Sequence, residues 1–263
     1  MSSMFTITSV VLLSFYIIEN KQMIIHAFSQ INSNENVHEN KTVDEAVQEL
    51  ETKKDEQTEE KVTLKDKVFI EAPLIKQMPE LPRGCEVVSL GMLLAYHNIH
   101  IDKMELAKKV KHNPSTYKKV GEKIHFGNPH NGFVGDMYSF EQPGLGVYHK
   151  PIAELAEKYA KDMTVYDFTG ADFSAIKEQL SLGRPVWVII NSHYKKLPDS
   201  EFITWQTEDG PIDITYRLHS VLITGYDENY IYFNDPLNYR SKADIKNFES
   251  AWKQMGKQAI TIF

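Results

Sequence analysis

Apolar residues follow a helical spacing in the first half of the globular part of the chain and form β-prone runs in its second half. Four segments carry the spacing and end signals of helices: 85–97, 102–111, 151–161 and 172–182. Asp102 is a suitable N-cap for the second segment, and Gly183 is a suitable stop for the fourth. A short closing helix is expected around Trp252.

The β-prone runs are short and separated by turn residues. A fully apolar run at Pro185–Ile190 predicts a central strand. Two hairpins are expected, one within 203–214 and one across 219–236. Further strands are expected at 165–168 and 259–263, and residues 68–70 are expected to be an extended entry to the segment 77–85. Helices that precede mostly antiparallel strands predict an α+β domain.

Two stretches show neither the helical nor the strand spacing of apolar residues. Residues 113–147 contain so many glycines, prolines and asparagines that we expect a long loop, either a wall of a cleft or a structural Ω-type loop. Residues 191–217 are polar and irregular outside the first hairpin.

The N-terminal residues differ in composition from the rest. Phe5–Ile18 is a mostly apolar run of signal-peptide length, so residues 1–29 are predicted to be a signal peptide or a membrane anchor. Residues 30–62 are polar and are predicted to be a mostly disordered linker. Within them Val43, Ala46, Val47 and Leu50 form a helical stripe, which suits either a docking pro-segment or a transient helix. The folded domain is expected to span 63–263.

Charge narrows the range of functions. The chain of 263 residues has a formal net charge of −7. Residues 30–60 hold ten acidic residues against three lysines, which accounts for this whole excess. The folded part is therefore close to neutral, which argues against a nucleic-acid-binding surface. The chain has one cysteine, so an internal disulfide is excluded.

That cysteine, Cys85, lies where a nucleophile would be expected. Pro79 and Pro82 predict an extended approach, and Gly84 predicts a turn into the helix at 85–97. Cys85 then falls in the first turn, where free N–H groups and the helix dipole favour a thiolate. The alternative is a small buried hydrophobic residue, the commonest role of a lone cysteine.

The second hairpin offers Cys85 a base. If Tyr226 pairs with Tyr230, Val221 lies opposite Asp235, and His219 projects from the same face. A carboxylate beside an imidazole fixes its tautomer and stabilises its charged form. The predicted roles are Cys85 as nucleophile, His219 as general base and acid, and Asp235 as the group that orients His219. Gln77 is predicted to join the Cys85 N–H in an oxyanion hole.

Other candidates have weaker support. His193 follows the strand at 185–190 and rivals His219, but no carboxylate partner for it is apparent. His125 and His130 lack a cluster of further ligands and are interpreted as loop residues rather than a metal site. No phosphate-binding loop, dinucleotide fingerprint or nucleophile-elbow serine is present.

Four blocks in order resemble the bacterial C39-like peptidase family, papain-fold proteins related to bacteriocin-processing peptidase domains. They are Gln77…Glu80-Leu-Pro-x-Gly-Cys85-Glu86, Gly132-Phe-Val-Gly135, Gly183-x-Pro-Val186 and His219…Gly225-Tyr-Asp227…Asn234-Asp-Pro236. The resemblance covers roughly residues 65–263. It implies a papain-like α+β fold, catalytic Cys, His and Asp residues and an oxyanion-hole glutamine, and Cys85, His219, Asp235 and Gln77 occupy these positions.

The sequence thus predicts an exported thiol hydrolase, secreted or held at the cell envelope, that cleaves peptide or related amide bonds of a peptide or protein substrate. No cofactor or metal is expected, and membrane contact is expected through the N-terminus only. Two alternatives stay open: a catalytically silent papain-fold binding protein of the cell envelope, and an acyl transferase that uses the same residues.

Overall fold

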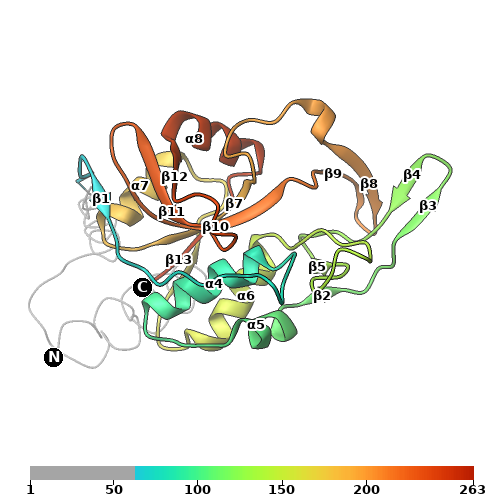
Figure 1. Cartoon of the computed structure of the whole chain (residues 1–263), viewed down its shortest axis with the longest axis horizontal. Helices are drawn as coiled ribbons and strands as arrows, with labels where there is room; N and C mark the ends of the chain where they lie inside the picture. Colours follow the sequence, from blue (N-terminus) through green and yellow to red (C-terminus); the bar gives the residue numbers. More distant parts are fainter. Residues whose placement is uncertain (1–62) are drawn as a thin grey trace, which may run out of the picture. The chain divides into compact units, whose positions relative to one another are not determined.

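A computed structural model of the chain describes residues 63–263. The predicted signal peptide or anchor at 1–29, the predicted linker at 30–62 and its amphipathic stripe lie outside the described residues. Five α-helices, α4 to α8, and a seven-stranded sheet dominate the described part (Figure 1). None of these helices has the length and apolar character needed to cross a membrane.

The main sheet is antiparallel, with the strand order β12-β11-β10-β7-β13-β6 and with β1 paired to the far end of β10. Its strands are β1 (Val68–Phe69), β6 (Val165–Asp167), β7 (Val186–Asn191), β10 (Leu218–Tyr226), β11 (Tyr230–Asn234), β12 (Lys242–Asp244) and β13 (Ala259–Ile262). The predicted central strand at 185–190 is confirmed as β7, because β10 and β13 flank it. Strand β12 was not predicted.

Helices cover both faces of this sheet. They are α4 (Cys85–Tyr96), α5 (Lys103–Lys109), α6 (His149–Tyr159), α7 (Phe173–Ser181) and α8 (Ile245–Gln254). On one face Trp187 and Ile189 of β7 join a core with α4, α5 and α6. On the other face Val188 and Ile190 join a second core with α7 and α8. Strand β7 is buried on both faces, which explains its unbroken apolar sequence.

The predicted helices are confirmed, and the ends of the four with predicted bounds are shifted by at most two residues. Asp102 caps α5, and its carboxylate accepts a hydrogen bond from the N–H of Met104 at 2.8 Å. Gly183 follows α7 with a φ of +80°, the left-handed geometry expected after a helix end. Helix α8 begins at Ile245 because Asp244 caps it, earlier than the spacing around Trp252 indicates.

The prediction of a continuous loop over 113–147 is wrong in part. The region contributes β2 (His112–Asn113), β3 (Lys118–Val120), β4 (Lys123–His125) and β5 (Phe133–Val134). Strand β4 pairs in parallel with β8 (Ile203–Thr207), and β8 forms the predicted first hairpin with β9 (Gly210–Ile214). This second sheet extends to one side of the main one (Figure 1). Strands β3 and β4 form a local hairpin around Gly121, which the sequence analysis missed, whereas the partner of β4 on its other side, β8, lies far along the chain.

The register of the β10–β11 hairpin decides where the candidate site residues lie. At the turn Tyr226 pairs with Ile231, so the predicted pairing of Tyr226 with Tyr230 is wrong by one residue. An irregularity between Ile223 and Gly225 then shifts the register, and Leu222 pairs with Asn234. Continued by one residue, this register places Asp235 opposite Val221, as predicted.

Candidate active site

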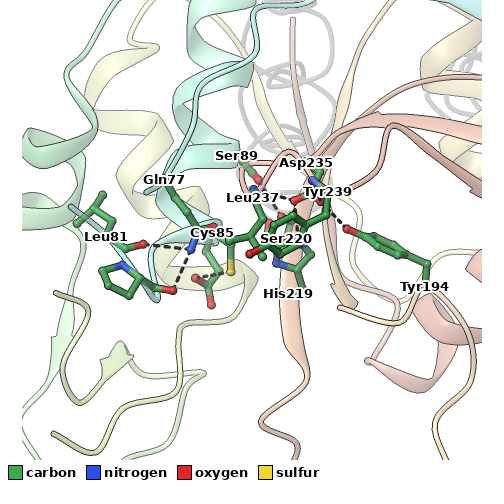
Figure 2. Close-up of polar contacts among 12 residues, drawn as sticks. Gln77, Leu81, Cys85, Ser89, Tyr194, His219, Ser220, Asp235, Leu237 and Tyr239 are labelled. Atoms are coloured by element: carbon green, nitrogen blue, oxygen red, sulfur yellow. Dashed lines mark hydrogen bonds and ion pairs between the residues drawn. The ribbon is translucent and has the colours of Figure 1, made fainter. Parts of the chain in front are cut away.

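The segment before α4 is folded into turns, so the predicted extended approach is wrong. The N–H of Leu81 donates to the carbonyl of Gln77 at 3.1 Å, and the N–H of Gly84 donates to the carbonyl of Leu81 at 3.0 Å. Proline suits turns as well as extended chain. The turns bring Gln77 back toward the start of α4 (Figure 2).

The side chain of Gln77 is 2% exposed and stabilises these turns. Its Nε2 donates to the carbonyls of Leu81 at 3.1 Å and Pro82 at 2.9 Å, which uses both amide hydrogens. The opposite amide orientation would aim an oxygen at two carbonyls, so the hydrogen-bond network assigns this one. The Oε1 atom is buried and has no hydrogen-bond partner among the described residues.

Two contacts hold the start of α4 against the rest of the site. The Ser89 hydroxyl donates to the carbonyl of Ser220 on β10 at 3.1 Å. The backbone N–H of Gln77 donates to the carbonyl of Pro236, next to Asp235, at 3.0 Å. The two regions that the sequence predicts to meet are therefore joined by hydrogen bonds.

Cys85 is the first residue of α4 and is 7% exposed. Its Sγ donates to Oε2 of Glu86 at 3.3 Å, and the backbone N–H of Ser220 bonds the same sulfur. Because Ser220 directly follows His219, the thiol lies against β10 beside the imidazole (Figure 2). The structure therefore places Cys85 against β10, the strand that carries His219.

The protonation state of the thiol differs from the prediction. Burial, followed by the charge of Glu86 and the hydrogen bond to it, raises the pKa of Cys85 well above its usual value. The Ser220 N–H acts in the opposite direction but is outweighed. The expected thiolate at the helix start is therefore wrong for this resting structure, because the helix also places a carboxyl group beside the sulfur.

His219 and Asp235 form a buried pair. Nε2 of His219 lies 2.9 Å from Oδ1 of Asp235, and the two residues are 2% and 1% exposed. His219 lies near the start of β10, and Asp235 follows the end of β11. The expectation that these two side chains project together is confirmed.

The Asp235 carboxylate has three further donors. The N–H of Leu237 bonds Oδ1 at 2.9 Å, while the Tyr194 hydroxyl and the Tyr239 N–H bond Oδ2 at 2.9 and 3.3 Å. Burial alone would raise the pKa of Asp235. The hydrogen bond and charge of His219, with the bonds from Leu237 and Tyr194, lower it below its usual value. Asp235 is therefore held as an anion that orients His219.

Tyr194 is a site residue that the sequence analysis missed. It follows β7 in a turn with a φ of +55°, a geometry uncommon for a large residue. Its ring stacks on Phe233 with centroids 4.8 Å apart, and burial, then the charge of Asp235, raises the pKa of its hydroxyl. A tyrosine just after the central strand is the only sequence signal for this role.

The other histidines lie apart from the His219–Asp235 pair. His193 is exposed, and its backbone N–H donates to the side-chain Oδ1 of Asn191 at 3.0 Å. His125 is exposed on β4, and His130 packs edge-on against Tyr148. Among the described residues, no group of three or more His, Cys, Asp or Glu side chains is placed to hold a metal ion.

Glu86 is a second residue that the sequence analysis did not assign. Its carboxyl is 1% exposed, Oε1 accepts the Val147 N–H at 3.1 Å, and Oε2 accepts the Cys85 thiol. Burial raises the pKa of Glu86 to about 7, against weaker hydrogen-bond effects in the opposite direction. The side chain of the residue after Cys85 is therefore titratable near neutrality.

This raised pKa predicts a pH-dependent loss of stability. Between the unfolded value of 4.5 and the folded value of about 7, the folded chain binds the extra proton, so the free energy of unfolding falls as pH rises. Glu86→Gln removes this dependence. The difference in free energy of unfolding between the variant and the native chain is therefore expected to shift in favour of the variant by about 3 kcal/mol between pH 4.5 and pH 7. Urea unfolding of both proteins across this range measures the difference. A constant difference between them at all pH values would contradict the assignment.

A helix with a cysteine in its first turn, packed on an antiparallel sheet that carries a histidine and an aspartate, is the arrangement of papain-like cysteine peptidases. Residues 69–260 match the model of the Peptidase_C39 like family, and the chain belongs to that family. It is 49% identical over 185 residues to the uncharacterized protein YvpB of Bacillus subtilis, which covers 70% of each chain.

A crystal structure gives the same result for the fold. The crystallised protein, a candidate C39-like peptidase from Bacillus anthracis, is 40% identical in sequence to this chain, and the two structures align with a TM-score of 0.69. The match covers 76% of this chain and 98% of that one. The predicted fold class and family are therefore confirmed.

Proposed function

We propose that this protein is an exported cysteine peptidase that hydrolyses peptide or related amide bonds through Cys85, His219 and Asp235. The observation that carries the proposal is the buried His219–Asp235 contact of 2.9 Å beside the only thiol of the chain. The family assignment supports the same chemistry. Digestion of a mixed peptide library, compared between the native chain and Cys85→Ala, tests it.

In this proposal each ring nitrogen of His219 has its own role. Nε2 donates its hydrogen to Asp235, so Nδ1 is the nitrogen that takes the thiol proton. The Cys85 sulfur attacks the carbonyl carbon of the substrate, and the imidazolium returns the proton to the leaving amine. Water then attacks the thioester with His219 as the base, which restores the thiol.

The oxyanion of the tetrahedral intermediate needs donors near the sulfur. The Cys85 N–H is one, because the first N–H groups of a helix have no partner within the helix. The proposed second donor is Nε2 of Gln77, whose hydrogens bond Leu81 and Pro82 in the resting structure. In this proposal Gln77 exchanges one of those bonds for the oxyanion during the reaction.

Gln77→Ala separates donation to the oxyanion from support of the turns. Removing one oxyanion donor is expected to lower kcat by roughly 10²–10³-fold. Alkylation of Cys85 by iodoacetamide forms no oxyanion, so its rate is expected to change by only a few-fold. Hydrolysis and alkylation are measured on the same preparations. An equal fall in both rates would show that Gln77 acts only by holding the segment before α4.

One observation favours the alternative of a catalytically silent binding protein. Burial and Glu86 keep the Cys85 thiol protonated in the resting structure, as expected for a cysteine without a catalytic role. Against this, a silent site has no need of an anionic, fully bonded Asp235 beside His219. An acyl transferase uses the same residues and is distinguished by adding an amine acceptor and analysing the products by mass spectrometry.

A further inference from the structure

The mechanism above leaves one buried group without a role. The Glu86 carboxyl accepts the hydrogen of the Cys85 thiol, with Oε2 3.3 Å from Sγ. Donation of the thiol hydrogen to Glu86 directs it away from His219, the group that must receive it. The contact therefore bears directly on how the nucleophile is activated.

The carboxyl is fixed in this position from several sides. Its Oε1 accepts the Val147 N–H, and its backbone carbonyl accepts the indole N–H of Trp187 at 3.0 Å. Gly146 lies so close that a Cβ atom built there would be 2.1 Å from Oε1. The chain at 146–147 thus closes over the carboxyl and holds it against the sulfur.

The charged and titratable groups around Glu86 come from four elements. On its own helix it contacts Cys85, and from the start of α6 it faces Tyr148, whose pKa burial and then the charge of Glu86 raise to about 12. Across the thiol stand His219 on β10 and Asp235 after β11. Within residues 63–263, Glu86 forms no ion pair with a lysine or arginine. Its negative charge is therefore not neutralised by a neighbouring cation.

We propose that Glu86 is a further catalytic residue, whose protonated carboxyl donates a hydrogen bond to the Cys85 thiolate in the reactive state. This inference rests on the proposed function. When Glu86 is ionised, transfer of the thiol proton to His219 would leave two anions in contact. When Glu86 is protonated, one thiolate faces both the imidazolium and the carboxyl O–H, so the charge-separated state is stabilised.

The proton transfers in acylation balance without consuming the Glu86 proton. The proton of Sγ moves to His219, the sulfur forms a bond to the carbonyl carbon, and the leaving amine takes the proton from His219. Glu86 keeps its own proton throughout. The reactive fraction of the protein is therefore expected to decrease as Glu86 loses its proton.

The rate of alkylation of Cys85 by iodoacetamide, followed by intact mass in the full chain, tests this inference. For the native chain we expect the rate to fall between about pH 7 and about pH 8, approaching tenfold for each pH unit, where an ordinary thiol reacts faster. Glu86→Gln carries an N–H donor in place of the O–H and cannot ionise, so its rate is expected not to fall. Glu157→Gln, an exposed change of the same charge on α6, is expected to keep the native profile.

A native rate that rises steadily through this range would overturn the inference, and this result does not depend on whether the variant folds. The same alkaline fall in Glu86→Gln would overturn it as well. The variant His219→Ala distinguishes a failure of the Glu86 role from a failure of the proposed function. Equal alkylation rates in that variant and the native chain would reject the proposed function and the Glu86 role together, whereas a His219-dependent rate without the alkaline fall would reject the Glu86 role alone.

Discussion

Replacing Cys85 with alanine is expected to reduce peptide hydrolysis by roughly 10⁵–10⁶-fold in kcat, the loss seen when the nucleophile of an acyl-transfer enzyme is removed. The reason is that Cys85 is the only thiol of the chain and the only group in the proposal that forms the acyl-enzyme. The measurement is the appearance of new peptide termini from a mixed library, followed by mass spectrometry.

The control for this experiment is the stability of the variant. Alanine retains the helix at α4 and removes only one sulfur atom, so thermal unfolding is expected to stay cooperative and close to that of the native chain. Cleavage that continues in a folded Cys85→Ala protein would contradict the proposal. A cellular phenotype that survives this substitution would support the binding-protein alternative.

Replacing Asp235 with asparagine is expected to lower kcat/KM by about 10²–10⁴-fold, because the neutral amide no longer stabilises the imidazolium and permits the wrong tautomer of His219. The carboxylate also accepts hydrogen bonds from Tyr194, Leu237 and Tyr239. An amide has one acceptor oxygen and a donor nitrogen, so it cannot serve all of them.

Asp213→Asn provides a matched control. Asp213 lies exposed on β9, where its carboxylate accepts a hydrogen bond from Thr204, so the same chemical change is made far from the thiol. We expect it to retain native kinetics. If Asp235→Asn also retained them, His219 would not depend on Asp235, and the triad would be wrong. Should Asp235→Asn fail to fold, His219→Ala tests the same base with the carboxylate left in place.

Much of the site was predictable because its residues lie in elements with strong local signals. The apolar run after Gly84 fixed the nucleophile helix, and the two β-prone runs around Asp227 fixed the hairpin that carries His219 and Asp235. The assumed turn was wrong by one residue. The irregularity between Ile223 and Gly225 compensates for this, so the two side chains meet on the predicted face.

Glu86 and Tyr194 could not be predicted, because their roles depend on segments that reach them from far along the chain. Val147 closes over the Glu86 carboxyl only when the 113–147 region is folded, and that region is ordered partly through the pairing of β4 with β8. Tyr194 reaches Asp235 from the turn after β7 through an uncommon backbone angle. Neither contact has a periodic or compositional signature.

The protonation state of the Cys85 thiol could not be predicted from the sequence for a similar reason. Its position at a helix start favours a thiolate, but the neighbouring carboxyl and the burial of both groups outweigh that effect. Cys85 and Glu86 are adjacent in the sequence, but adjacency alone does not indicate that both side chains turn toward the same buried space. In the proposed mechanism, activation of Cys85 therefore depends on His219 and on the proton of Glu86, more than on the helix dipole.

The central claim is that Cys85 forms an acyl-enzyme with His219 as its base. Rapid mixing of the full chain with an activated p-nitrophenyl ester measures this directly, by the release of nitrophenol and by the intact mass of acid-quenched samples. We predict a burst of one equivalent per chain, an acyl adduct that maps to Cys85, and a much slower burst in His219→Ala. Ester or peptide turnover without a burst, and without an adduct at Cys85, would contradict the account.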